Sequence, residues 1–240
     1  MSLFMSGDLG GTNFRISLFE ADGRLVHVAA GAKCPGKLLH HTRFRTADYE
    51  EFGDIIGEFL AECKAEGIEG LPSTACFSCA GPVQPNNTVQ MTNIQRWPLI
   101  DGNALAAKYE IGGGVKLIND FVAAGYGLLT LNPDEVVVLQ EGEPAEGAPV
   151  ACVGAGTGLG ECYLTFDGAG VPTCWGSEGG HTEWSPRNET EAGLQAYLKK
   201  KYTSEGSRNR ISVERVISGP GLADTFEYLL TLHPELDSSA

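Results

Sequence analysis

One short pattern occurs twice in this sequence and constrains the fold more than any other feature. Each copy predicts a strand, a turn rich in glycine and threonine, and two further strands, starting at Leu3 and again at Val150. The two turns cover residues 10–13 and 154–160. A structural repeat of this kind predicts two similar domains, whose turns could grip the two ends of a polyphosphate across a cleft.

The first turn has two interpretations. Gly10 and Gly11 let a ligand approach the backbone closely and expose N–H groups to an anion. Asp8, at the end of the first strand, could hold a hydrated Mg²⁺ beside that anion. Alternatively, the segment is an ordinary hairpin in which Asp8 caps the turn.

Bulk composition limits the classes of partner. The 240 residues are 42% hydrophobic and 20% charged, which is typical of a globular protein, but the formal net charge is −14. Such an acidic chain is a poor candidate for binding nucleic acid or an anionic membrane. The sequence has no membrane-length apolar run or secretory signal, and its seven cysteines are an odd number. We therefore expect an intracellular protein with reduced, mostly buried thiols, and no metal shared by Cys76 and Cys79.

The segments between the repeats predict an α/β layered fold. A third strand of the first copy is expected at residues 24–30, followed by a loop-rich surface or an edge strand at 31–46. Later strands are expected at 73–80, 115–118 and 135–140, and helices at 48–66, from residue 121, at 189–202 and at 222–232. Asp101 and Ser212 are the expected caps of two short helices.

Asn119 and Asp120 stand where a predicted buried strand runs directly into a predicted helix. A carboxylate at such a junction can cap the helix. It can also point from the edge of the sheet into a cleft and accept a proton. The two roles are compatible, because a capping backbone would hold the carboxylate in one direction.

A second polar segment covers residues 175–183 and contains Glu178, His181 and Glu183. His181 and Glu183 could be metal ligands, but no third ligand or cysteine cluster lies near them in the sequence. The same groups would serve as hydrogen-bond donors and acceptors for a substrate rich in hydroxyl groups.

Six motifs together resemble the bacterial-type glucokinases, members of the actin-like ATPase superfamily that includes hexokinases. They occur in the family's order at residues 8–15, 91–93, 118–121, 154–160, 178–181 and 212–221. The resemblance implies an α/β fold of two actin-like ATPase (ribonuclease H-like) domains with a cleft between them. These would be a small domain at residues 1–118 and a large domain at 119–240. We expect the second domain to be incomplete, because the family continues with an adenosine-binding segment, and we expect the strand at 150–153 to lie at an open edge.

The resemblance also implies transfer of the ATP γ-phosphoryl group to the 6-hydroxyl of glucose, with Asp120 as general base. The implied glucose-binding residues are Asn93, Asn119, Asp120, Glu178, His181 and Glu214. The implied ATP- and phosphate-binding residues are Asp8, Gly10, Gly11, Thr12 and Asn13 in the first turn and Gly156, Thr157 and Gly158 in the second. Asp8 would hold Mg²⁺ through water.

Several alternatives stay open at the level of sequence. The chain could be a sugar-binding or regulatory module, or an inactive fragment, instead of a glucokinase. ATP, ADP or polyphosphate could each lie between two glycine turns. We expect a cytoplasmic protein, with organelle import by a C-terminal signal left open, and a homodimer as the assembly.

Overall fold

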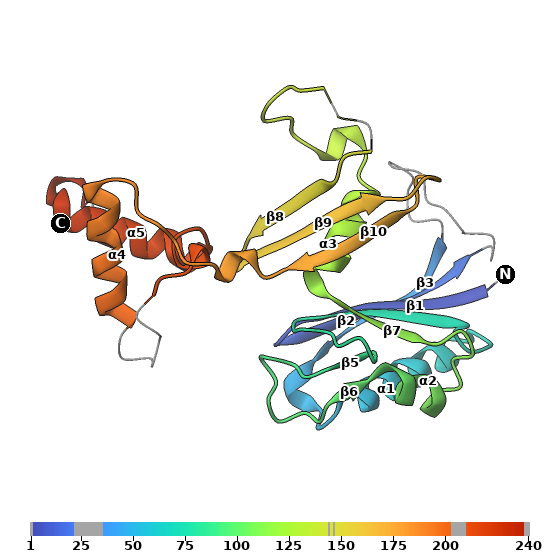
Figure 1. Cartoon of the computed structure of the whole chain (residues 1–240). Helices are drawn as coiled ribbons and strands as arrows, with labels where there is room; N and C mark the ends of the chain where they lie inside the picture. Colours follow the sequence, from blue (N-terminus) through green and yellow to red (C-terminus); the bar gives the residue numbers. More distant parts are fainter. Residues whose placement is uncertain (1, 22–35, 144, 146, 203–209, 238–240) are drawn as a thin grey trace. The chain divides into compact units, whose positions relative to one another are not determined.

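The computed structural model describes residues 2–21, 36–143, 145, 147–202 and 210–237 (Figure 1). The chain forms two compact units, Met1–Pro144 and Ala145–Ala240. The predicted division after residue 118 stays a prediction, because compactness alone does not define a functional domain.

The first unit is built on a five-stranded sheet with the strand order β3-β2-β1-β4-β7. β1 pairs antiparallel with β2, and β2 with β3, whereas β4 and β7 continue the sheet parallel to β1. The strands of this sheet are β1 (Ser2–Leu9), β2 (Asn13–Ala21), β3 (Gly36–Arg45), β4 (Thr74–Cys79) and β7 (Val115–Asn119). Because β1, β4 and β7 are parallel, their carboxyl ends lie at the same edge of the sheet.

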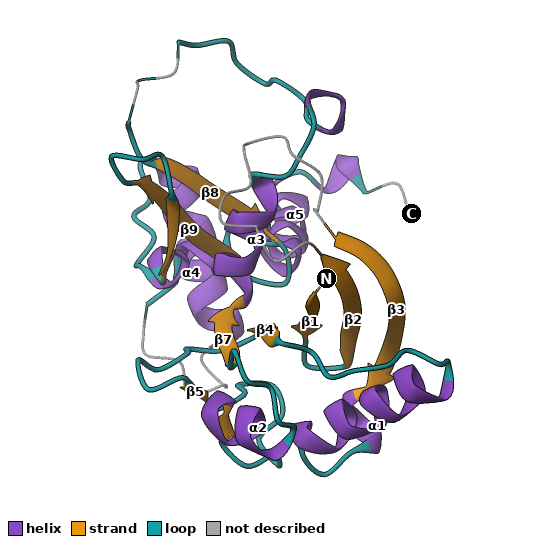
Figure 2. Ribbon diagram, turned by 90° about the vertical axis from the view of Figure 1, so that its right-hand side faces the viewer, coloured by secondary structure: helices purple, strands orange, loops and turns teal. Residues whose placement is uncertain are grey.

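Helices α1 (Phe52–Ala65) and α2 (Gly102–Lys108) cover one face of this sheet (Figures 1 and 2). The apolar residues of α1 recur at three- and four-residue spacings, so one stripe of the helix faces the core. Asp101 caps α2 by accepting hydrogen bonds from two amides of its first turn, as predicted. The largest fully buried side chains of this core include Trp97, Phe14, Phe59 and Phe77. Two short strands, β5 (Thr88–Val89) and β6 (Ile100–Asp101), form a separate pair.

The second unit contains a three-stranded antiparallel sheet with the order β10-β9-β8. Its elements are β8 (Val150–Ala155), β9 (Leu159–Phe166), β10 (Pro172–Ser177), the 3₁₀ helices η3 (Gly179–His181) and η5 (Val213–Arg215), and the helices α4 (Glu189–Tyr202) and α5 (Gly219–Leu232). Leu194, Leu198 and Ile211 form a small buried cluster in this unit.

The predicted repeat is confirmed, because a glycine turn joins the first two strands of each copy and a third strand pairs with the second. The strand predicted at residues 24–30 lies outside the described residues. β3 instead falls in the stretch predicted as loop-rich surface or an edge strand, and it is an edge strand. β8 pairs with β9 only, among the described residues, so it too is an edge, as predicted.

The strand predicted at residues 135–140 is wrong. A 3₁₀ helix, η2 (Pro133–Glu135), is followed by residues without regular structure, and Val137 and Leu139 are 84% and 95% exposed. β-Branched residues favour a strand only where a neighbouring strand supplies hydrogen bonds and packing, and these residues pair with no described strand.

Two predicted helix starts also need correction. Ser212 precedes η5, but its side chain makes no capping hydrogen bond. The last helix begins at Gly219 instead of Leu222, because Ser218 caps it and proline is compatible with its first turn. Within the described part of the chain, no helix combines the length and the apolar character that crossing a bilayer requires.

Candidate active site

In the first unit, polar side chains gather where the parallel strands end. Asp8 on β1 lies directly opposite Ser78 on β4, and Cys79 lies opposite Asn119 on β7. Ser78 is a buried residue, 6% exposed, and its hydroxyl donates a 2.8 Å hydrogen bond to Asp8 Oδ1. Asp8 Oδ2 lies 3.6 Å from Arg15 Nη1. The Asp8 carboxylate therefore has a defined orientation, and Ser78 is a contributor that the sequence motifs did not reveal.

The Cys79 thiol is buried beside the same strand ends. Burial is the main cause that raises the pKa of Cys79 to about 12, and the nearby Cys76, Asp120 and Asp8 add to it. Cys79 therefore stays a neutral thiol near pH 7, which makes it a poor nucleophile and a poor metal ligand. Among the described residues Cys79 forms no disulfide, and the prediction of reduced thiols stays a prediction.

The first glycine turn is held from two sides. Gly10 donates its backbone N–H to the Asn13 carbonyl at 3.0 Å, and Thr46 donates its hydroxyl to the Gly11 carbonyl at 2.8 Å. A Cβ added to Gly11 would lie 2.9 Å from Asn93 Cβ, so only glycine lets Asn93 pack against the turn. Thr12 and Asn93 are exposed. The backbone of the turn is thus held in place, with Gly10 and Gly11 half-buried and Thr12 exposed.

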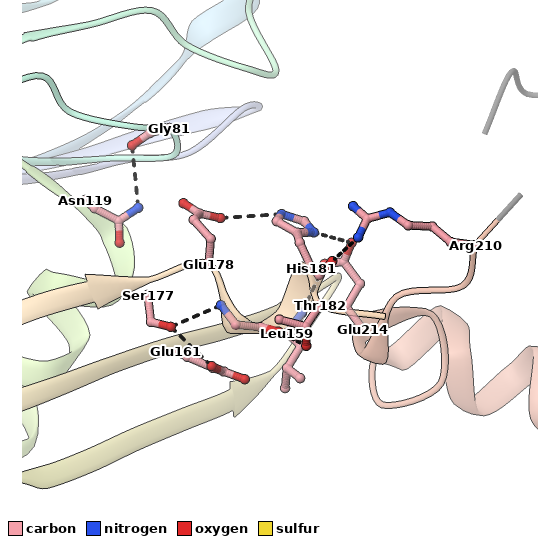
Figure 3. Close-up of polar contacts among 11 residues, drawn as sticks. Gly81, Asn119, Leu159, Glu161, Ser177, Glu178, His181, Thr182, Arg210 and Glu214 are labelled. Carbon is pink, nitrogen blue, oxygen red and sulfur yellow. Dashed lines mark hydrogen bonds and ion pairs between the residues drawn. The ribbon is translucent and has the colours of Figure 1, made fainter. Parts of the chain in front are cut away.

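Asn119, not Asp120, caps helix α3 (Asp120–Leu128). Asn119 has the extended backbone of an N-cap, and its Oδ1 accepts from the Phe121 and Val122 amides at 2.9 and 3.3 Å. Its amide nitrogen lies 3.5 Å from the Gly81 carbonyl (Figure 3). Asp120 is therefore the first residue of the helix, exposed, with Oδ1 accepting from the Phe121 amide at 2.9 Å. The cap and the candidate base are separate residues, and the cap holds the base in place.

Asn119→Ala should weaken the start of α3 by about 1 kcal/mol, because two first-turn amides lose their acceptor. Asn119→Asp should recover most of that loss, since aspartate also caps. Amide hydrogen exchange at Phe121 and Val122 measures the effect. Unchanged exchange at both amides in Asn119→Ala would show that Asn119 is not the cap.

In the second unit, the second glycine turn joins β8 to β9. Gly156 donates its N–H to the Gly158 carbonyl at 2.9 Å, and its own carbonyl accepts from the Gly219 amide, at the start of α5, at 2.8 Å. Gly156 and Thr157 are exposed. This turn is therefore tied to a helix start while its outer backbone stays accessible.

The same unit brings three other predicted residues into one chain of contacts (Figure 3). His181 Nδ1 lies 3.1 Å from Glu214 Oε1, and His181 Nε2 lies 3.5 Å from Glu178 Oε2. The side chains of His181 and Glu178 are 57% and 77% exposed, whereas that of Glu214 is 22% exposed. An accessible imidazole between two carboxylates presents alternating donors and acceptors, which suits the hydroxyl groups of a sugar.

His181 and Glu214 also line a pocket of about 240 Å³ in this unit. Arg210 shares this lining and donates to the His181 carbonyl at 3.0 Å. The other lining residues are Tyr202, Ile211, Ser212 and Arg215. Sequence motifs did not single out Arg210, because its contact with His181 spans 29 residues.

The carboxylate of Asp8 fits a Mg²⁺ ion whose other ligands are phosphate oxygens and water molecules. No group of three or more His, Cys, Asp or Glu side chains is arranged to bind a metal within the described ranges. Mg²⁺ that bridges phosphates needs only one or two protein carboxylates and keeps several waters. Asp8 supplies one such carboxylate near the carboxyl end of the central strand β1.

Solved structures with the same arrangement of elements define the class of fold. A glucokinase from an Antarctic psychrotroph superposes with a TM-score of 0.74 at 26% identity, over 98% of this chain and 66% of that one. A Balamuthia mandrillaris glucokinase in complex with glucose gives 0.65 at 20% identity, over 99% and 65%. The fold is thus the predicted α/β, actin-like ATPase fold of sugar kinases.

Sequence comparison identifies the family within this class. A sequence model of the family described as Glucokinase matches residues 5–239. The glucokinase of Synechocystis sp. is 38% identical over 98% of this chain and 63% of the relative, and that of Nostoc sp. is 36% identical over 95% and 61%. The chain belongs to the glucokinase family, and it spans about three fifths of the length of these curated relatives.

Proposed function

We propose that this protein transfers the γ-phosphoryl group of ATP to the 6-hydroxyl of glucose. The observation that carries this proposal is the exposed Asp120 carboxylate at the end of β7, held by its own helix start, in a chain of the glucokinase family. Family membership supplies the reaction class, and the position of Asp120 supplies the base.

In the proposed reaction, the protein mainly positions the reactants and stabilises charge. Asp120 accepts the proton of the glucose 6-hydroxyl, and the oxygen attacks the γ-phosphorus. The bond from that phosphorus to the bridging oxygen breaks, and ADP leaves with the electron pair. The transferring group reacts through a loose transition state, so alignment and charge stabilisation dominate catalysis.

Glucose is neutral, so its recognition rests on hydrogen bonds. Glu178, His181 and Glu214 in the second unit would bind sugar hydroxyls, together with Asn119, and Asn93 would lie at the rim. Convergent carboxylate acceptors orient a polyol without requiring charge on the ligand.

The phosphate chain would bind to backbone amides, because the net charge of −14 leaves little general attraction for an anion. Gly10, Gly11, Thr12 and Asn13 would form the first phosphate loop, and Gly156, Thr157 and Gly158 the second. Asp8, oriented by Ser78, would hold Mg²⁺ through water, and the ion would neutralise phosphate charge.

A coupled assay for glucose 6-phosphate tests the proposal, with ATP, ADP and polyphosphate as separate donors. Formation of product with ATP and Mg²⁺ supports it, and turnover only with another donor would reassign the donor. Glucose binding by calorimetry without turnover would instead identify a sugar-binding module.

We also propose a cytoplasmic homodimer without nucleic-acid or membrane partners. The net negative charge supports the absence of nucleic-acid and membrane partners, because nucleic-acid phosphates and anionic lipids would repel an acidic protein. Light scattering of the purified protein tests the dimer, and cell fractionation tests the location.

A further inference from the structure

The Glu214 carboxylate touches two segments that serve different parts of the proposed reaction. Its Oε1 lies 3.1 Å from His181 Nδ1, on the sugar side. Its Oε2 accepts from the Leu159 amide at 3.3 Å, and Leu159 is the residue after Gly158 in the second glycine turn and the first residue of β9. Its side chain is only 22% exposed, so the carboxylate is held between these partners and is not free in solvent.

Space is tight between Glu214 and this turn. A Cβ added to Gly158 would lie 2.5 Å from Glu214 Oε2, so even one methyl group would force the carboxylate or the turn to move. A Cβ added to Gly156, two residues earlier, would meet nothing within 4 Å. Neither glycine has a left-handed backbone. The two positions therefore differ in available space and not in conformational strain.

The Leu159 peptide is also held from the His181 side. A Cβ added to Gly180 would lie 2.2 Å from the Leu159 carbonyl oxygen, so the residue before His181 packs directly against this peptide. The N–H of Leu159 is bound by Glu214, and its carbonyl lies against Gly180. A shift of the Leu159 peptide would therefore disturb its hydrogen bond with Glu214 and its close contact with Gly180.

We propose that Glu214, besides its proposed contact with a sugar hydroxyl, couples the second glycine turn to His181, so that the position of the turn controls sugar affinity. This inference rests on the proposed function, because it takes His181 as a sugar contact and the turn as a phosphate loop. The coupling must be reciprocal: a donor that holds the turn in place strengthens sugar binding, and sugar strengthens donor binding by the same factor.

Two single substitutions in the same turn test the proposal in the whole chain. Gly158→Ala should shift the imidazole ¹⁵N resonances of His181 and weaken glucose binding about tenfold or more in calorimetry. Gly156→Ala should change nucleotide binding but leave the His181 resonances and the glucose Kd within about twofold of wild type. Equal His181 resonances and equal glucose Kd values in the two variants would overturn the proposal.

A double-mutant cycle separates positioning from general damage to the fold. Glu214→Asp shortens the side chain by one methylene and should relieve the contact with a methyl group at residue 158. The double variant Gly158→Ala/Glu214→Asp should therefore lose less glucose-binding free energy than the two single variants lose in sum. In the double variant Gly156→Ala/Glu214→Asp, the two losses of binding free energy should be additive. Additive losses in both pairs would contradict the coupling.

Failure of the proposed function gives a different result. If the wild-type chain binds no glucose, the assignment of the sugar site is wrong. The His181 resonances still report whether Gly158→Ala moves the imidazole, because that measurement needs no ligand.

Discussion

Asp120→Asn is expected to lower the rate of glucose phosphorylation by about 10³-fold, while glucose binding changes little. Asparagine keeps the size of the side chain and can still accept from the Phe121 amide through its oxygen, but it cannot take a proton from the sugar. General-base catalysis contributes roughly 10²–10⁴-fold to enzymatic rates. The turnover number and the glucose Kd, measured separately, check this prediction.

Asp54→Asn is the matched control for charge. Asp54 is also an exposed acid in the first turn of a helix, so its removal costs the same small helix-dipole term. Turnover should stay near wild type in this variant. A similar loss of turnover in both variants, or near wild-type turnover in Asp120→Asn, would show that Asp120 is not the general base.

Asp224→Ala is expected to destabilise the packing of α4 on α5 by about 2–3 kcal/mol. Asp224 is 6% exposed, and its carboxylate accepts from Lys201 Nζ at 2.7 Å and from the Tyr202 hydroxyl. The substitution leaves these donors without their buried acceptor. The expected loss is smaller than for a fully buried pair, because the Lys201 side chain is 34% exposed and keeps water.

The stabilisation by Asp224 should depend on pH. Burial by itself would raise the pKa of Asp224, but hydrogen bonds from Lys201 and Tyr202 outweigh burial and lower the pKa. A lowered folded-state pKa means that the contribution is complete above the unfolded value of about 3.9 and disappears as pH falls through the folded value. The difference between wild type and Asp224→Ala should therefore shrink below about pH 4.

Amide hydrogen exchange in α4 and α5 measures this difference at pH 7 and at acidic pH. Arg187→Ala provides a control at the start of the same helix, since Arg187 and Glu191 form an ion pair in which the arginine side chain is 87% exposed. That pair should contribute less than about 1 kcal/mol. A loss in Asp224→Ala no larger than in Arg187→Ala would show that the Asp224 contacts are not stabilising.

Local sequence patterns predicted much of the architecture. The repeated strands, the span of α4 and the position of Asp120 at a strand-to-helix junction all follow from residues close together in the chain. Hydrophobic periodicity and glycine turns act over a few residues, so they are readable without knowledge of the fold. The same patterns failed at residues 135–140, where β-branched residues have strand propensity but pair with no described strand.

Local patterns thus determine which residue types stand at the ends of strands and in the turns. Only the tertiary structure decides which of these side chains meet. The hydrogen bond from Ser78 to Asp8 depends on the parallel register of β1 and β4, and the contact of Glu214 with Leu159 joins residues 55 positions apart. The spacing of residues along a chain carries no direct record of strand register or of loop packing, so these contacts become visible only when the chain is folded.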